Sequence, residues 1–581
     1  MKLSDYMAEF LAKHTAHAFV GHGGCIVHLL DSLNAHPDIK VIPCQNEQGS
    51  SMSAEAYARV SGKIGLGIAT SGPGMVNLIQ GIACAYFDSI PTIFIAGAPP
   101  VHHLKGNRKA RQIGFQECEV VGIVKPITKY AVLVTDPKRI RYELEKLLHY
   151  ATEGRKGPVV LDLPDDLQRA EINPEELESF IPDTTIQLDT PKDSDIDQML
   201  SLIREAKKPV VIVGAGVKIG NAVPNMREFL KKSGLPFVGT WSTLDLFVED
   251  EPGFIGSFGV SSTRAGNFAV QNSDLIISLA SRLDTHETGS NPAKFAMKAK
   301  KIMIDIDPDE LNKENGLCLD IAIQSDINAF FEKINSKTIE TQDLAEWKER
   351  TKKWTERYPV CLPEYYDQVD KVNPYVFMNE LSKETKEGDI VIPDAGGNLT
   401  WTMQAYKLRS RQMLFSAFNH SPMGYALPAA IGAQFAEPEK QVICIIGDGG
   451  LQMNIQELET VSYYNLPIKI FLINNEGYGI IKQTIDTWLD SRYVCTDTNS
   501  GLGFPDFKKV AKAYKIETME IPNQKNLNQK LRIALDFKGP LLIDVRLKSD
   551  QKITPKLAFG RPIEDMDPLL PREEFEENMR D

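Results

Sequence analysis

The chain repeats one local pattern: a short apolar run, then a glycine-rich or polar turn, then residues spaced as on an amphipathic helix. The run Val442–Ile446 leads into Gly447, and the run Pro209–Val213 leads into Gly214. Runs this short suit buried strands, and a helix after each strand is the connection that parallel strands require. We therefore predict an α/β protein built from parallel sheets with helices on both faces.

The pattern falls into three blocks that charged, proline-containing stretches separate. A chain of 581 residues is too long for one hydrophobic core, so three domains are the natural expectation. We expect a first domain at residues 1–175, a central domain at 190–340, a third domain at 370–550 and a tail at 551–581.

Composition and charge exclude several classes of protein. The net charge of −13 and the pI near 5.4 are the opposite of what a nucleic-acid-binding surface needs. The apolar runs are too short to span a bilayer, and the N-terminal segment lacks the apolar block of a signal peptide. The eight cysteines form no CxxC pair and no zinc-ligand spacing. These features predict a soluble, cytoplasmic protein that binds neither nucleic acid nor membranes.

Two consecutive runs of the third block end in residues that suit a metal ion. The first run is followed by Gly-Asp-Gly-Gly at 447–450, and the second by Asn474-Asn475. Because neighbouring parallel strands end at the same edge of a sheet, we expect Asp448 and Asn475 to lie close together. A carboxylate, an amide oxygen and a backbone carbonyl suit a hard cation such as Mg²⁺, and the glycines let backbone N–H groups approach phosphates. Each motif alone is a common turn, but together they predict a site for a metal and a diphosphate.

With matching segments in all three blocks, the chain resembles the acetolactate synthase-like branch of the thiamine-diphosphate enzymes from about residue 15 to residue 550. The resemblance implies three doubly wound parallel-sheet domains: pyrimidine-binding, central and diphosphate-binding. It implies Mg²⁺ held by the side chains of Asp448 and Asn475 and by the carbonyl of Gly477. Further matches to diphosphate contacts are Gly449, Gly450, Tyr478, Gly479 and Ile480.

The resemblance assigns the other half of the cofactor site to the first block. Glu47, ahead of a helix pattern, matches the family's activating glutamate. A carboxyl group bonded to the aminopyrimidine ring favours the imino tautomer, whose nitrogen takes the proton from the thiazolium carbon C2. Without the resemblance, Glu47 would be an ordinary charge at a helix N-terminus. In the family the two halves come from different subunits, which implies a homodimer or a homotetramer.

Several other residues match cofactor contacts of the family. Met423 matches the bulky apolar residue that wedges the cofactor into a bent shape, although a core methionine is the simpler interpretation. The family commonly has glycine at Ser421, where the contact is a backbone carbonyl, and a Gln-His pair at Gly397-Asn398. The remaining matches are Gly23, Gly24, Pro73 and Asn77.

The reaction is indicated by residues near the expected thiazolium. Phe115-Gln116 resembles the synthases' segment there and favours joining two carbonyl compounds. The nearby His102-His103 resembles the paired histidines of pyruvate decarboxylases but lies about a dozen residues too early. His286 replaces the arginine that receives the acceptor's carboxylate, and a largely neutral imidazole lacks the permanent bidentate clamp of guanidinium. Thr484 replaces the tryptophan that selects larger 2-oxoacids.

We therefore predict a carboligase that uses thiamine diphosphate and Mg²⁺. It decarboxylates pyruvate or a related 2-oxoacid and transfers the acyl carbanion to an acceptor carbonyl. Two acceptors are consistent with the sequence: a second pyruvate, or a larger compound such as a keto-sugar nucleotide. A 2-oxoacid decarboxylase and a 2-hydroxyacyl-CoA lyase are the alternatives. A non-catalytic paralogue is disfavoured because Glu47, Asp448 and Asn475 are all present.

The central block gives a weaker signal. Gly214-Ala-Gly216 with Gly220 has the spacing GxGxxxG, which only approximates the dinucleotide fingerprint, and no suitable acidic residue follows. A nicotinamide dehydrogenase is therefore a weak alternative. In the synthases this domain holds FAD, and Arg282 matches a residue near the flavin phosphates. The sequence leaves open whether FAD is bound.

Overall fold

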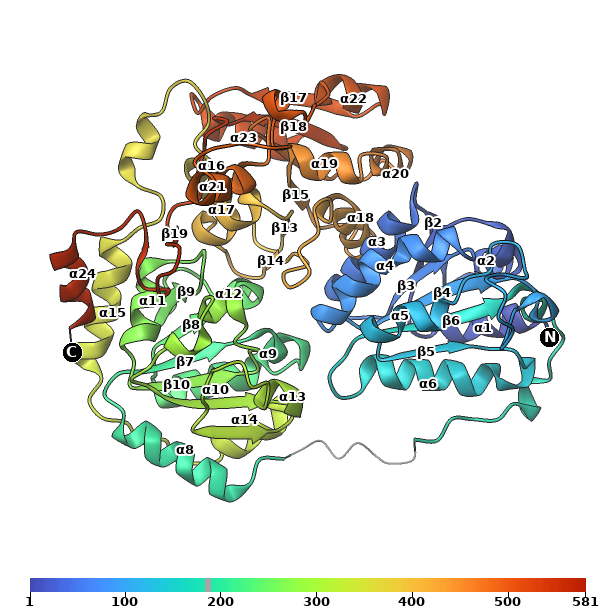
Figure 1. Ribbon diagram of the computed structural model, residues 1–581, viewed down its shortest axis with the longest axis horizontal. Coiled ribbons are helices and arrows are strands. Elements are labelled where there is room, and N and C mark those ends of the chain that lie inside the picture. The colour runs from blue at the N-terminus through green and yellow to red at the C-terminus, as the bar shows by residue number, and fades with distance from the viewer. Residues whose placement is uncertain (183–189, 581) are drawn as a thin grey trace.

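The computed structural model describes residues 1–182 and 190–580, and three parallel six-stranded sheets form its framework (Figure 1). The first sheet has the order β2-β1-β3-β4-β6-β5, and the third has the same relative order, β14-β13-β15-β16-β18-β17. The central sheet, β12-β11-β10-β7-β8-β9, has the order of a dinucleotide-binding fold. The predicted fold class, three doubly wound α/β domains, is confirmed.

The strands are short, and those in the middle of each sheet are buried, as the apolar runs predict, whereas edge strands such as β2 and β17 are partly exposed. The first sheet consists of β1 (His17–Gly21), β2 (Lys40–Pro43), β3 (Gly65–Ala69), β4 (Thr92–Ala98), β5 (Tyr130–Leu133) and β6 (Pro158–Pro164). The central sheet consists of β7 (Pro209–Val213), β8 (Phe237–Gly239), β9 (Phe254–Ser257), β10 (Leu275–Leu279), β11 (Lys300–Asp305) and β12 (Ile321–Gln324). The third sheet consists of β13 (Ile390–Pro393), β14 (Met413–Leu414), β15 (Val442–Gly447), β16 (Lys469–Asn474), β17 (Glu517–Ile521) and β18 (Leu541–Arg546).

Helices connect the strands of each sheet. Those of the first domain are α1 (Leu3–Ala12), α2 (Val27–Ala35), α3 (Glu47–Ser61), α4 (Pro73–Phe87), α5 (Val120–Val124), α6 (Ile140–Thr152) and α7 (Asp165–Gln168). Those of the central domain are α8 (Asp193–Glu205), α9 (Ala215–Ile219), α10 (Val223–Ser233), α11 (Arg264–Asn272), α12 (Thr285–Thr288), α13 (Pro308–Leu311) and α14 (Ile327–Asn335), followed by α15 (Ala345–Arg357). Those of the third domain are α16 (Pro374–Glu384), α17 (Gly397–Ala405), α18 (Ala426–Ala436), α19 (Asp448–Met453), α20 (Glu457–Tyr463), α21 (Gly479–Trp488), α22 (Phe507–Ala513) and α23 (Leu527–Asp536).

The first and third domains pack directly against each other through α3 and α18 (Figure 1). The Ser53 hydroxyl donates a hydrogen bond to the carbonyl of Pro428 over 2.7 Å. A side chain at Gly432 would place its Cβ 2.0 Å from the Ser53 carbonyl oxygen, so the close approach of the helices requires glycine there. Apolar residues of both domains form one buried cluster.

A buried ionic network reinforces this interface. The Arg59 guanidinium contacts the carboxylates of Glu55 and Asp88, the latter at 2.5 Å. Asp88 also accepts hydrogen bonds from the backbone N–H groups of Phe418 (3.0 Å) and Asn419 (3.1 Å) in the third domain. The Tyr425 hydroxyl, also from the third domain, donates to Glu55. The network therefore joins the two domains through one arginine.

The C-terminal tail is an ordered extension on the central domain. It contains the hairpin of β19 (Lys556–Leu557) and β20 (Met566–Asp567), and ends in α24 (Arg572–Met579). The Asn267 amide donates to the Ile563 carbonyl over 2.7 Å, and the Trp354 indole donates to the Asn578 side chain over 2.8 Å. Within the ranges 1–182 and 190–580, no helix is long and apolar enough to cross a membrane.

Replacing Arg59 with Ala should leave Glu55 and Asp88 buried without a counterion. Breaking a buried ion pair in this way costs about 3–5 kcal/mol, and we expect the free energy of unfolding in urea to fall by that amount. Lys63→Ala, at an exposed position two residues beyond α3, is the matched control and should change it by less than about 0.5 kcal/mol. Equal stability of the two variants would contradict a role for the network at this interface.

Candidate cofactor site

The register of β15 and β16 brings the two predicted metal motifs together. Gly447 of β15 pairs with Ile473 of β16, so Asp448 and Asn475 follow at the same edge of the third sheet. The Asp448 carboxylate accepts hydrogen bonds from the backbone N–H groups of Gly449 (2.7 Å) and Gly477 (3.2 Å). Its two oxygens therefore connect both strand ends.

Asp448 is a buried anion that lacks a protein counterion. Its residue is only 2% exposed, and burial raises the pKa of its carboxyl group to about 6. In the described ranges no lysine, arginine or histidine forms an ion pair with it. A bound cation would supply the missing positive charge and hold the carboxylate ionised.

Asn475 lies beside Asp448 in a loop whose backbone is fixed. The residue is buried, and a Cβ at Gly479 would come within 2.7 Å of its amide nitrogen. The backbone N–H of Tyr478 donates to the carbonyl of Thr496 over 2.8 Å, and Glu476 has a positive φ of 55°. The loop thus holds the Asn475 amide and the Gly477 backbone at the strand end.

The residues at this edge fit a hard cation that carries a diphosphate. The described residues contain no group of three or more His, Cys, Asp or Glu side chains able to hold a metal, so a purely side-chain site is excluded there. One carboxylate, one amide oxygen and one backbone carbonyl leave coordination positions for phosphate oxygens and water, as Mg²⁺ prefers. A Cβ at Gly449 would lie 2.1 Å from a Tyr478 ring carbon, and one at Gly450 would lie 2.1 Å from Asp394 Oδ2. Both positions therefore require glycine, because neighbouring side chains fill the space that a Cβ would occupy.

Asp394, which the sequence analysis missed, fixes the loop that carries Met423. Its carboxylate accepts hydrogen bonds from the N–H groups of Gly424 and Ala426, both at 3.0 Å, and burial raises its pKa to about 7. The Met423 methyl group lies 3.0 Å from the Cβ position of Gly449, so this side chain is at the candidate site. Ser421 has a positive φ of 49°, which accounts for the glycine common at this position in the family that the chain resembles. The signal for Asp394 was an acidic residue directly after the strand β13 (Ile390–Pro393).

Gly397 and Asn398 also lie at this edge, at the start of α17. The Asn398 amide donates to the Asp394 carbonyl over 2.7 Å, and its Oδ1 lies 3.2 Å from the Cβ position of Gly447. Asn398 is therefore next to β15, but its amide group already binds the backbone. Ile480, the second residue of α21, packs against the third domain's core.

Glu47 is the first residue of α3, and its side chain crosses the end of β1. The Asn46 side chain caps the helix by accepting from the Gln48 N–H over 2.9 Å. The Glu47 carboxylate accepts a hydrogen bond from the Asn77 amide over 2.9 Å, so two predicted residues meet. A Cβ at Gly21 would lie 2.2 Å from Glu47 Cγ. The position of Glu47 therefore requires glycine at residue 21, at the end of the first apolar run, and the sequence analysis missed this residue.

The remaining predicted residues of the first domain lie in the segments that follow β1 and β3 and in the loop that contains Phe115 and Gln116. A Cβ at Gly23 would collide with Thr70, whereas Gly24 faces open space. Pro73 begins α4, directly after Gly72, whose Cβ position lies 2.5 Å from the Gln116 carbonyl oxygen. Phe115 is 85% exposed. Phe115 and Gln116 therefore lie on a loop against the turn that leads to Asn77.

Among the described residues, Glu47 is not hydrogen-bonded to the predicted metal ligands of the same chain. Glu47 is half-buried, and Asn77 and Pro73 are exposed, whereas the metal-binding half is enclosed by its own domain.

His286 and Thr484 lie in different domains. His286 is in α12, and its ring packs edge-on against Trp241 at 4.3 Å between centroids. Although much of the residue is open to solvent, the protein packed beside the ring disfavours its charged form and lowers its pKa. Thr484, in α21, donates its hydroxyl to the Ile480 carbonyl over 3.1 Å.

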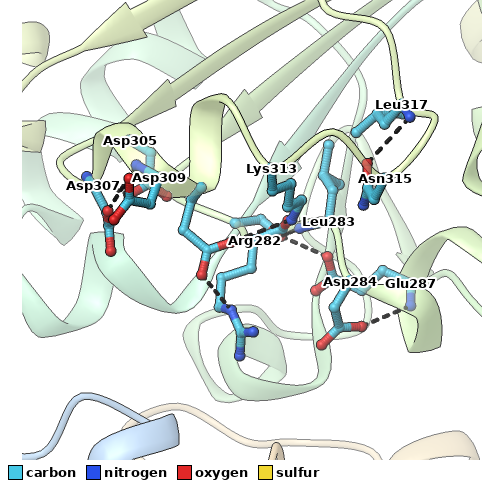
Figure 2. A network of polar contacts seen from close by, with 12 residues as sticks. Arg282, Leu283, Asp284, Glu287, Asp305, Asp307, Asp309, Lys313, Asn315 and Leu317 are labelled. Atoms are coloured by element: carbon cyan, nitrogen blue, oxygen red, sulfur yellow. Dashed lines mark hydrogen bonds and ion pairs between the residues drawn. The ribbon is translucent and has the colours of Figure 1, made fainter. Parts of the chain in front are cut away.

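Arg282 takes part in the polar network of the central domain (Figure 2). Its guanidinium donates to Glu310 over 2.8 Å, and Lys313 pairs with the same carboxylate at 3.2 Å. Gly214 has a packing explanation, because a Cβ there would lie 2.3 Å from the Ala280 carbonyl oxygen. Neither observation requires a bound nucleotide.

His102 and His103 form an exposed pair on the short helix η2 (Val101–His103), with ring centroids 4.1 Å apart. No hydrogen bond in the described chain links them to Glu47. The structure gives them no place among the residues around that carboxylate.

Gly449→Ala should weaken binding of Mg²⁺ with inorganic diphosphate, because the new methyl group would collide with Tyr478. Overpacking of 1–3 kcal/mol corresponds to about a tenfold to hundredfold loss of affinity, measured by isothermal titration calorimetry. Gly503→Ala, where a Cβ meets nothing within 4 Å and φ is not positive, is the control. Unchanged affinity in Gly449→Ala would argue against a ligand at this backbone.

Comparison with known proteins places the chain in a family. Three models of thiamine pyrophosphate enzymes match it: the N-terminal TPP binding domain at residues 1–123, the central domain at 196–334 and the C-terminal TPP binding domain at 394–545. The acetolactate synthase large subunit of Porphyra purpurea is 33% identical, with 96% of this chain and 93% of that protein covered. That of Lactococcus lactis is 32% identical (96% and 94%), and the mitochondrial catalytic subunit of Saccharomyces cerevisiae is 31% identical (98% and 84%).

Each of the three matched models overlaps one of the three sheets, and the similarity to these relatives covers 96% of the chain. The chain therefore belongs to the thiamine pyrophosphate enzyme family, as a thiamine-diphosphate-dependent enzyme of the acetolactate synthase type.

Proposed function

We propose that this protein decarboxylates pyruvate and transfers the resulting acetyl carbanion to the carbonyl of a second pyruvate, forming acetolactate. One observation carries the proposal: the chain has both carboxylates that the chemistry needs. Asp448 is buried beside Asn475, and Glu47 accepts a hydrogen bond from Asn77. Relatives named acetolactate synthase favour this reaction over the keto-sugar, decarboxylase and lyase alternatives.

Residues of the third domain would bind the diphosphate end of the cofactor, and residues of the first domain would bind its aminopyrimidine ring. When bound, thiamine diphosphate supplies the nucleophilic carbon and accepts the electrons that decarboxylation releases. Asp448, Asn475 and the Gly477 carbonyl would hold Mg²⁺, which would bind the diphosphate. Met423 would pack against the cofactor from the third domain. Glu47 holds a proton at the aminopyrimidine ring, and Asn77 orients its carboxyl group.

We infer that the active unit is a homodimer or a larger assembly of dimers. The Glu47–Asn77 pair lies at the surface, and Phe115 is 85% exposed. A carboxyl group that acts on a ring in a dry pocket must be shielded from water. The metal-binding half of a second chain would shield Glu47. Each active site then combines Glu47 of one chain with Asp448 of the other.

FAD is a further candidate ligand of the central domain, which has the strand order of dinucleotide-binding folds. The proposed reaction transfers no electrons to an external acceptor, so flavin would act structurally. Flavin absorption bands in the purified protein would support it, and their absence after supplementation with FAD would exclude it.

Glu47→Ala should slow turnover of pyruvate by about a hundredfold or more, because it removes a proton-transfer partner. Acetolactate formation from pyruvate alone is the assay. If Glu47→Ala retained full activity, the mechanism would be wrong.

Mixing the variants Glu47→Ala and Asp448→Ala tests where the sites lie. Each variant alone should be inactive. In a dimer with shared sites, each mixed dimer regains one complete site, so random reassociation should restore about a quarter of the wild-type activity. Recovery at the background level would place both halves in one chain.

His286→Arg should improve the use of pyruvate as acceptor, because guanidinium offers a permanent bidentate contact to its carboxylate. A charged hydrogen bond of about 1.5–3 kcal/mol predicts a rise in kcat/KM of about tenfold or more. The Glu47-dependent decarboxylation step should change little when CO₂ release is measured in a single turnover, before the acceptor reacts. A fall in acetolactate formation would show that His286 already provides the better contact.

A further inference from the structure

Glu457, the first residue of α20, belongs to the third domain but binds the backbone of the first. Its carboxylate accepts hydrogen bonds from the N–H of Gln45 at 3.1 Å and from the N–H of Asn46 at 3.0 Å. These two residues immediately precede Glu47. The Thr460 hydroxyl donates to the other oxygen of Glu457 over 2.8 Å.

The environment of Glu457 is built around this contact. The residue is fully buried and forms no ion pair in the described chain, so its hydrogen bonds alone compensate for loss of water. A Cβ at Gly49, in the first turn of α3, would lie 2.4 Å from Glu457 Oε1. Burial raises the pKa of the carboxyl group, and the three donors oppose that rise.

The segment that leads to Glu457 begins at the candidate metal ligand Asp448. Between them, the Asn454 amide donates to the Gly424 carbonyl over 2.9 Å and contacts the Met52 sulfur at 3.8 Å. Gly424 follows Met423, and Met52 is in α3, the helix that begins at Glu47. The α19–α20 segment therefore contacts the metal-binding half and the Glu47 half of its own chain.

We propose that Glu457 is a positioning residue that sets the place of Glu47 through the backbone of Gln45 and Asn46. The inference rests on the proposed function, in which Glu47 acts on the aminopyrimidine ring. Because the two halves of one chain serve different active sites of the dimer, α19–α20 also connects one site mechanically to the other. A displacement of Glu47 by about 1 Å would be enough to slow activation by about a hundredfold.

The test compares Glu457→Ala, Glu457→Gln and the control Glu459→Ala, an exposed residue of the same helix. The first readout is the rate at which the C2 proton of bound thiamine diphosphate exchanges with deuterium, followed by NMR after acid quench. The second is amide hydrogen exchange of the segment 42–52, followed by mass spectrometry in the apo protein.

We expect Glu457→Ala to slow C2 exchange at least about tenfold and to remove amide protection at Gln45 and Asn46. Glu457→Gln keeps one oxygen that accepts both N–H groups, so it should stay within about threefold of wild type. Glu459→Ala should change neither readout. If Glu457→Ala does not fold, the test uses Gly49→Ala instead. Its methyl group would push the Glu457 carboxylate away from Gln45 and Asn46, so C2 exchange should also be slower.

Two results would overturn the inference. Unchanged C2 exchange in Glu457→Ala, with protection lost at 42–52, would mean that the contact does not position Glu47. If C2 exchange were as slow in Glu457→Gln as in Glu457→Ala, the charge of Glu457, and not its hydrogen bonds to the backbone, would determine the exchange rate. Failure of the proposed function is distinguishable, because in that case Glu47→Ala itself would leave C2 exchange unchanged.

Discussion

The parallel pairing of β15 with β16 is the constraint on which the candidate metal site depends. Because Gly447 is level with Ile473, the residues that follow both strands emerge at one edge, and Asp448 accepts hydrogen bonds from its own loop and from the neighbouring one. A slip of one residue would turn the following side chains to the other face of the sheet. The strands are wholly buried, so the packing of both faces fixes the register that the site needs.

Three buried carboxylates then tie this sheet edge to its surroundings. Asp394 holds the Met423 loop, Glu457 holds the turn before Glu47, and Glu55 binds Arg59 at the domain interface. Burial raises the pKa of all three, so each carboxylate is retained at a cost that its donors offset. An apolar residue would avoid the desolvation of a carboxylate, but it would leave backbone N–H groups at Asp394 and Glu457 without acceptors, and Arg59 without its partner at Glu55. The carboxylates therefore stabilise one arrangement of loops and domains.

The sequence predicted what short-range patterns encode. Alternating apolar runs and helical spacing predicted parallel α/β domains, which the structure and the family models confirm, and Gly-Asp-Gly-Gly after a strand singled out Asp448. Glu47 had no local signal beyond a position before a helix, and only the resemblance to a family identified it. Glu457 and Gly21 were missed because their roles are contacts through space. The bond from Gln45 to Glu457 joins residues 412 positions apart, and no spacing rule reaches that far.

The unequal exposure of the two halves has a consequence for when the proposed enzyme becomes active. Asp448 is enclosed by its own domain, so under the proposed function a cation and a diphosphate would meet Asp448 and Asn475 within one chain. Glu47 lies at an open surface beside the exposed Asn77, where water weakens a hydrogen bond to the ring. Under the proposed function, only association of two chains removes that water. Cofactor capture then precedes assembly, while activation by Glu47 requires it, and the contact of Glu457 with Gln45 and Asn46 keeps that carboxylate in place until the partner covers it.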